Sequence, residues 1–95
     1  MRLLLIGASV PGRQMRLLRE QYAPGASTGA EAIVHAEGEE CGLVTRGVIE
    51  LTVDGMSSIL NAGDGYYFPS TLAHRFRNIG ADEAEIISAN TPANF

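Results

Sequence analysis

The segment from Gly63 to Asn78 constrains the fold of this chain more than any other part of the sequence. It begins with a Gly-Asp turn, continues through an aromatic run to Pro69, and then places His74 at the head of an alternating polar and apolar stretch. Alternation with a period of two is typical of a β-strand with one buried face. A second histidine, His35, lies upstream and is followed by a group of glutamates. Two strand histidines with carboxylates between them predict a metal or small-ligand site inside a β-barrel.

Turn signals recur along the chain at the spacing that is typical of an all-β sandwich or barrel. Asp54-Gly55 lies between two apolar segments and predicts a two-residue hairpin. No segment has a sustained helical period, and Pro24-Gly25 ends the segment 15–23, which mixes apolar and charged residues. We therefore expect extended segments at 3–8, 15–23, 31–36, 40–46, 48–53, 56–60, 66–68, 74–79 and 84–90.

Length and charge exclude several classes of protein. The 95 residues predict one domain, 1–95, of a size at which a single core supports folding. The net charge of −4 and the scattered arginines argue against direct nucleic-acid binding, which needs clustered basic residues. The single cysteine forms no internal disulfide, which is compatible with a cytoplasmic location. No apolar run reaches the length of a membrane span, so we expect no membrane association.

The N-terminal residues 1–12 resemble the start of an export signal. Their apolar run is short, however, lacks a clear small-x-small cleavage site and ends at Pro11-Gly12. We expect instead an N-terminal strand or dimer arm at 1–12, followed by the barrel at 13–95. The run Leu3–Ala8 carries no charge that would protect a free sheet edge. It should lie against its own sheet or a second copy, which predicts a homodimer with two-fold symmetry.

The spacing of the glycines and histidines resembles the two motifs of the cupin superfamily, over nearly the whole chain from about residue 16. The first motif is matched by Gly29, His35, Glu40 and Gly47, and the second by Gly63, Pro69, His74 and Asn78. Glu37 stands where the first motif has its second histidine, and Thr71 replaces the last glycine of the second motif. The resemblance implies an all-β fold, a small antiparallel β-barrel or double-stranded β-helix of the jelly-roll type.

The resemblance also implies a set of metal ligands, which are His35, Glu40 and His74, with Glu37 and Glu39 as further candidates. Only one of the neighbours Glu39 and Glu40 points inward on a strand, and the spacing to the next motif glycine favours Glu40. Imidazole and carboxylate donors suit a divalent transition metal such as Zn²⁺, Fe²⁺, Mn²⁺ or Ni²⁺. No organic cofactor is expected. The alternative is a site in which the same side chains hold an organic ligand by hydrogen bonds.

Four segments are similar to one group in particular, the C-terminal cupin domain of bacterial regulators with an Xre-type helix-turn-helix. These segments are Ala23–Gly29, His35–Gly42, Gly63-Asp64 and Asn90–Phe95. In that group the helical domain binds DNA and the cupin domain senses a small-molecule effector, so effector sensing is the expected function. One alternative is a small metal-dependent enzyme, an oxygenase or isomerase that uses the same three residues, and another is a dimerisation module. Fold does not select among them.

Overall fold

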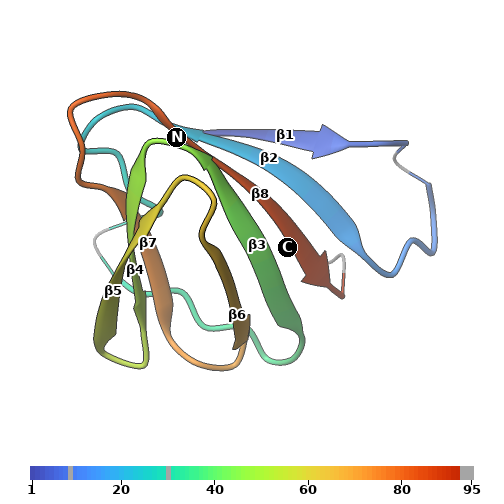
Figure 1. The fold of residues 1–95 in the computed structure, drawn as a ribbon. Helices are drawn as coiled ribbons and strands as arrows, with labels where there is room; N and C mark the ends of the chain where they lie inside the picture. Colours follow the sequence, from blue (N-terminus) through green and yellow to red (C-terminus); the bar gives the residue numbers. More distant parts are fainter. Residues whose placement is uncertain (9, 30, 93–95) are drawn as a thin grey trace.

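The computed structural model describes residues 1–8, 10–29 and 31–92, and its regular elements are all β-strands (Figure 1). Within these residues the strands are β1 (Arg2–Ile6), β2 (Arg16–Tyr22), β3 (Glu39–Arg46), β4 (Val48–Val53), β5 (Met56–Asn61), β6 (Gly65–Pro69), β7 (His74–Asn78) and β8 (Ala84–Thr91). The last three residues of the C-terminal segment Asn90–Phe95 lie outside the described residues. None of the described segments forms a helix that is long and apolar enough to cross a membrane.

The strands form two antiparallel sheets. The larger sheet has the order β1-β2-β8-β3-β6, and the smaller sheet has the order β5-β4-β7. Figure 1 shows the smaller sheet at the left, while β1 and the connection that follows it extend away from it at the right. The prediction of an all-β jelly-roll barrel is confirmed.

The core lies between the two sheets and is built from side chains that alternate inward along each strand. Its buried apolar members are Tyr22, Val44, Ile49, Leu51, Phe68, Phe76, Ala84 and Ile86. Inward residues of paired strands stand opposite one another, as Val44 does with Ile86 and Leu51 with Phe76. Full burial of a large apolar side chain contributes about 1.5–3 kcal/mol. Stability therefore depends on keeping the strand register, because a slip of one residue would turn these side chains outward.

The hairpin predicted at Asp54-Gly55 is confirmed between β4 and β5. Both residues have positive φ angles, 50° and 79°. A two-residue turn of this type needs positive φ at both central positions, and Asp followed by Gly is the sequence that adopts it most easily.

The strand expected at 31–36 is absent, and that prediction was wrong. Ile33 and His74 form only an isolated bridge, in which each backbone N–H donates to the other residue's carbonyl at 2.7 and 2.9 Å. Ser27 makes a second isolated bridge to Arg77. The segment before β3 thus follows β7 through separate backbone hydrogen bonds, but it does not form a continuous ladder with it. Local alternation predicts a strand, but a strand forms only where a neighbour offers several consecutive partners.

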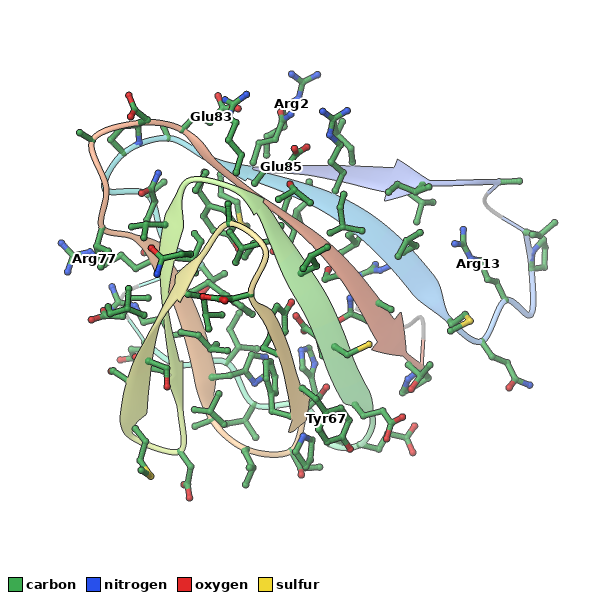
Figure 2. The ribbon with its side chains drawn as sticks, viewed as in Figure 1. Arg2, Arg13, Tyr67, Arg77, Glu83 and Glu85 are labelled. Atoms are coloured by element: carbon green, nitrogen blue, oxygen red, sulfur yellow. The ribbon has the colours of Figure 1, made fainter. Side chains whose placement is uncertain are left out.

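Within residues 1–12 the structure has one strand, β1, which forms one edge of the larger sheet and pairs with β2. Arg13 holds the connection that follows it. Its guanidinium donates to the carbonyl oxygens of Ile6 at 3.0 Å, Ala8 at 2.9 Å and Met15 at 2.7 Å. Figure 2 shows Arg13 within this connection, beyond the end of β1.

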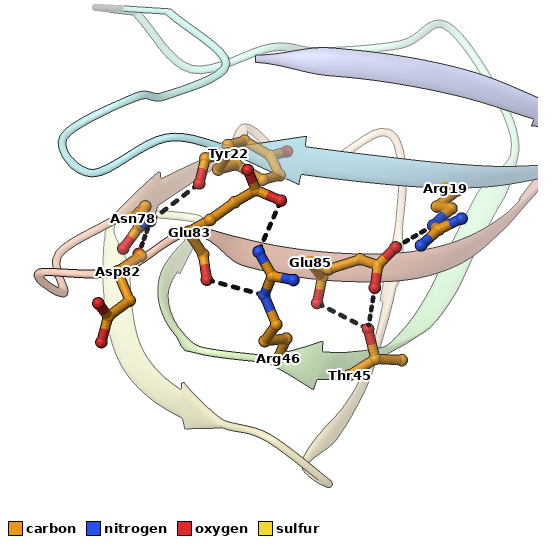
Figure 3. Close-up of polar contacts among 8 residues, drawn as sticks. All are labelled: Arg19, Tyr22, Thr45, Arg46, Asn78, Asp82, Glu83 and Glu85. Atoms are coloured by element: carbon orange, nitrogen blue, oxygen red, sulfur yellow. Dashed lines mark hydrogen bonds and ion pairs between the residues drawn. The ribbon is translucent and has the colours of Figure 1, made fainter.

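Asn78, the last residue of the second motif, is fully buried and joins three segments of the chain (Figure 3). Its Nδ2 donates to the carbonyl oxygens of Tyr22 at 3.0 Å and Asp82 at 2.8 Å. Its Oδ1 accepts a hydrogen bond of 2.8 Å from the backbone N–H of Gly80. One side chain therefore fixes the end of β2 and the turn between β7 and β8, so the motif asparagine has a structural role.

Candidate functional site

A pocket of about 130 Å³ lies at one end of the barrel, between the two sheets. A cavity of roughly 150 Å³ holds a molecule of the size of benzene, so this pocket suits a small ligand. Its apolar wall is formed by Met1, Leu3, Leu18, Ile33 and Phe76. Its charged and titratable lining residues are Glu20, His35, Glu40 and His74. The fold thus brings the three residues of the predicted set, His35, Glu40 and His74, into one pocket.

The two histidines stand side by side in this pocket. Their ring centroids are 5.4 Å apart and their planes differ by 27°. The Nδ1 atom of His74 lies 2.8 Å from the carbonyl oxygen of Leu72. Because a carbonyl oxygen only accepts, Nδ1 carries the proton of the neutral ring and Nε2 is the available acceptor. Burial lowers the pKa of His74, although its hydrogen bond with the Leu72 carbonyl acts in the opposite direction, and the lowered pKa favours this neutral form.

Glu40 points inward from β3, as its spacing predicted, and is only 6% exposed. Its Oε2 accepts a hydrogen bond of 2.6 Å from the Tyr66 hydroxyl. Burial raises the pKa of the Glu40 carboxyl to about 7, although the hydrogen bond from Tyr66 acts in the opposite direction. The charge of Glu20 raises this pKa further, while Arg16 lowers it. At neutral pH the pocket therefore contains a carboxyl group close to its own pKa.

Glu20 is a pocket residue that the sequence analysis missed. It lies on β2, is 5% exposed, and accepts hydrogen bonds from the hydroxyls of Tyr22 at 2.7 Å and Ser88 at 2.5 Å. A signal was present in the sequence, because Glu20 stands between Leu18 and Tyr22 on the inward side of an alternating strand. A charged residue at an inward position indicates either a functional role or a buried hydrogen-bond network.

Glu37 and Glu39, the further candidates, lie outside this pocket. Glu39 is exposed at the start of β3, on the outer face of the sheet, and accepts a hydrogen bond of 3.2 Å from the Tyr67 hydroxyl. Glu37 lies next to Gly38, near Thr91 and Pro92. Neither of these residues therefore lines the pocket that contains the two histidines.

The donors present fit a divalent metal ion only in part. Two neighbouring imidazoles are suitable ligands, and His74 has the hydrogen bond on its second ring nitrogen that metal-bound histidines usually have. Across the described residues, however, no three His, Cys, Asp or Glu side chains lie together so that they could hold a metal ion. Glu40 lines the same pocket but is hydrogen-bonded to Tyr66. The metal set His35, Glu40 and His74 stays a prediction.

Solved structures of other proteins share this architecture. The Cupin_2 domain of an XRE family transcriptional regulator from Enterobacter cloacae has a TM-score of 0.84 and 20% identity, covering 98% of this chain and 97% of that one. At that identity the likeness shows the fold alone. A recombinant oxalate oxidase in complex with glycolate has a TM-score of 0.75 and 25% identity, over 85% of this chain and 43% of that one. A cupin domain from a regulator and an oxidase thus share the barrel.

A curated relative extends the similarity to sequence. The HTH-type transcriptional regulator PuuR of Escherichia coli (strain K12) is 42% identical over 85 residues, which cover 90% of this chain and 45% of PuuR. The chain therefore spans about half the length of this relative. The family described as "Cupin domain" (Cupin_2) matches residues 18–90, a span that includes both motifs and most of the barrel. This chain belongs to the Cupin_2 family.

Proposed function

We propose that this chain is the effector-binding cupin domain of a bacterial transcriptional regulator that acts in the cytoplasm. The observation that carries the proposal is the small pocket in which an apolar wall surrounds His35, His74 and Glu40. Such a combination, mostly apolar with a few fixed polar groups, is typical of small-molecule sites. The similarity to PuuR, an HTH-type regulator, supports sensing as the use of this pocket. In this proposal residues 1–95 form one domain, with 1–12 as an arm on the barrel at 13–95, and a separate domain contacts DNA.

The polar groups of the pocket are held in place by neighbours, which suits recognition. Glu20 is fixed by two hydroxyls, Glu40 by Tyr66, and His74 by a backbone carbonyl. Donors and acceptors that are already oriented bind a matching ligand without a large ordering penalty. A sensor must bind its effector, and the effector must bind one conformational state of the protein more tightly than another. It needs no turnover.

A small cupin enzyme, an oxygenase or isomerase, is the second candidate function. One observation favours it, namely the pKa of Glu40, which burial raises to about 7. A general acid or base works best when its pKa lies close to the working pH. The barrel shared with oxalate oxidase is compatible with this candidate but does not select it.

The first prediction separates these two functions. Among a panel of small metabolites, at least one should raise the melting temperature without being consumed, because a sensor binds and releases its effector unchanged. At about 100 times its dissociation constant, the stabilisation should reach roughly 2.7 kcal/mol. The measurement combines thermal melting with mass spectrometry of the incubated mixtures.

Variants make the same experiment site-specific. His74→Ala should abolish the stabilisation, because His74 lines the pocket. The matched control is Glu39→Gln, which changes a carboxylate on the outer face of the same region and should leave the stabilisation unchanged. Metal-dependent conversion of a stabilising compound, lost in His74→Ala, would replace the sensor proposal with the enzyme.

The second prediction concerns assembly as a homodimer through β1. This strand pairs with β2 on one side only, and its apolar sequence leaves the other edge available to the same strand of a second copy. Leu5 on β1 is 43% exposed, and Leu43 on the outer face of β3 is 44% exposed. Leu5→Glu should therefore produce monomers in analytical ultracentrifugation, whereas the matched variant Leu43→Glu should remain dimeric. Dissociation by Leu43→Glu alone would place the interface on the outer face of the sheet.

A further inference from the structure

Gly42 and Tyr66 form a close contact between the neighbouring strands β3 and β6. They stand opposite each other in the register of β3 and β6. A Cβ atom at position 42 would lie 2.5 Å from the Tyr66 hydroxyl oxygen and 2.6 Å from two ring carbons. Glycine at this position therefore leaves the space that the tyrosine ring occupies. The hydroxyl of Tyr66 reaches the next inward residue of β3, which is Glu40, at 2.6 Å.

A series of ring contacts connects the two histidines with Tyr66. His35 is 5.4 Å from His74, His74 is 4.7 Å from Phe68, and Phe68 is 5.7 Å from Tyr66, measured between ring centroids. The four rings therefore follow one another, with the histidines at one end and Tyr66 at the other. Phe68 stands directly opposite Glu40 in the strand register. The Glu40 carboxylate thus has a partner in Tyr66, and among the described residues it does not form a three-donor metal group with the histidines.

The Tyr66 hydroxyl is a part-buried donor whose partner is the Glu40 carboxylate. Burial raises the pKa of Tyr66 far above its usual value, so the phenol keeps its proton and acts as a donor to Glu40. A hydrogen bond to an ionised carboxylate is stronger than a neutral one, and a buried donor is costly to leave unpaired. A metal ion that recruits Glu40 to the histidines would have to displace this bond.

We propose that Tyr66, in the space left by Gly42, withholds Glu40 from the two histidines and so keeps a three-donor metal site latent in this chain. Tyr66 is a positioning residue, because it acts through Glu40. The two imidazoles alone form a weak site for divalent metal, since stable transition-metal sites usually take three or four protein donors. This inference does not depend on which effector the pocket binds, or on whether it binds one.

Tyr66→Phe tests the inference, because it removes the hydroxyl and retains the ring. The full chain is titrated with Zn²⁺ by calorimetry and with Co²⁺ by visible absorption, at about pH 8. That pH lies above the pKa of Glu40, so its protonation competes less with the metal. We expect the affinity of Tyr66→Phe for Zn²⁺ to exceed that of the wild-type protein by at least tenfold, or about 1.4 kcal/mol. The Co²⁺ complex should gain stronger visible bands, because an added carboxylate changes the coordination of the ion.

Three further variants make the outcome specific. Tyr67→Phe removes the neighbouring hydroxyl, which bonds Glu39 on the outer face, and should leave metal affinity unchanged. Adding Glu40→Gln to Tyr66→Phe should abolish the gain. Glu40→Gln alone should leave the metal affinity of the wild-type protein unchanged, and this comparison holds even if Tyr66→Phe folds poorly. Unchanged or weaker binding in a folded Tyr66→Phe would overturn the inference, as would loss of wild-type binding in Glu40→Gln.

Discussion

Asn78→Ala should destabilise the fold by about 3–5 kcal/mol, because it leaves three buried or partly buried backbone groups without their partner. These groups are the carbonyls of Tyr22 and Asp82 and the N–H of Gly80. A loss of this size is a large fraction of the 5–15 kcal/mol that usually separates folded from unfolded domains. The measurement is urea unfolding followed by circular dichroism, with the free energy of unfolding extrapolated to water.

An asparagine elsewhere in the same small barrel provides the control. Asn61 is exposed at the end of β5, and Asn61→Ala should change the free energy of unfolding by roughly 0.5 kcal/mol or less. If Asn78→Ala also changed it by less than about 1 kcal/mol, water would be replacing the lost hydrogen bonds, and the structural role assigned to Asn78 would be wrong.

Glu40→Gln should remove a large part of the pH dependence of stability. In the unfolded chain the carboxyl has its ordinary pKa of 4.5, whereas burial raises its pKa to about 7 in the fold. Between these values the folded state holds a proton that the unfolded state releases, so stability falls as pH rises through this window. The full effect of such a shift is about 3 kcal/mol, present below pH 4.5 and lost above pH 7.

The comparison uses urea unfolding of both proteins at about pH 4, 5, 6, 7 and 8. His74 has an opposite effect, because its lowered pKa makes the protein lose stability as pH falls below its usual value of 6.5. Since both proteins contain His74, its contribution largely cancels in the difference between them. As pH rises from 4.5 to 7, the free energy of unfolding of the wild-type protein should fall by about 3 kcal/mol relative to that of Glu40→Gln. Parallel stability curves would show that Glu40 is ionised in the fold at much lower pH than its burial implies.

The fold class and the β4–β5 hairpin could be predicted from the sequence, and the spacing to Gly47 favoured Glu40 over Glu39 as the inward residue. These features depend on short-range rules, because alternation sets which face a side chain occupies and Asp54-Gly55 suits one type of turn. The three residues that the motif resemblance implied as metal ligands, His35, Glu40 and His74, line one pocket, and their role as ligands stays a prediction. Short-range alternation failed at 31–36, where the neighbouring strand offers too few consecutive partners.

The groups that surround those three residues depend on contacts between distant parts of the chain. Glu20 accepts a hydrogen bond from Ser88, which is 68 residues away in the sequence. Glu40 accepts one from Tyr66, which is 26 residues away. These contacts depend on how β2 aligns with β8 and how β3 aligns with β6, and such alignments involve the whole sheet. Gly42 illustrates the reason, because a glycine in a strand signals that something approaches closely, while only the paired strands show that the approaching group is Tyr66.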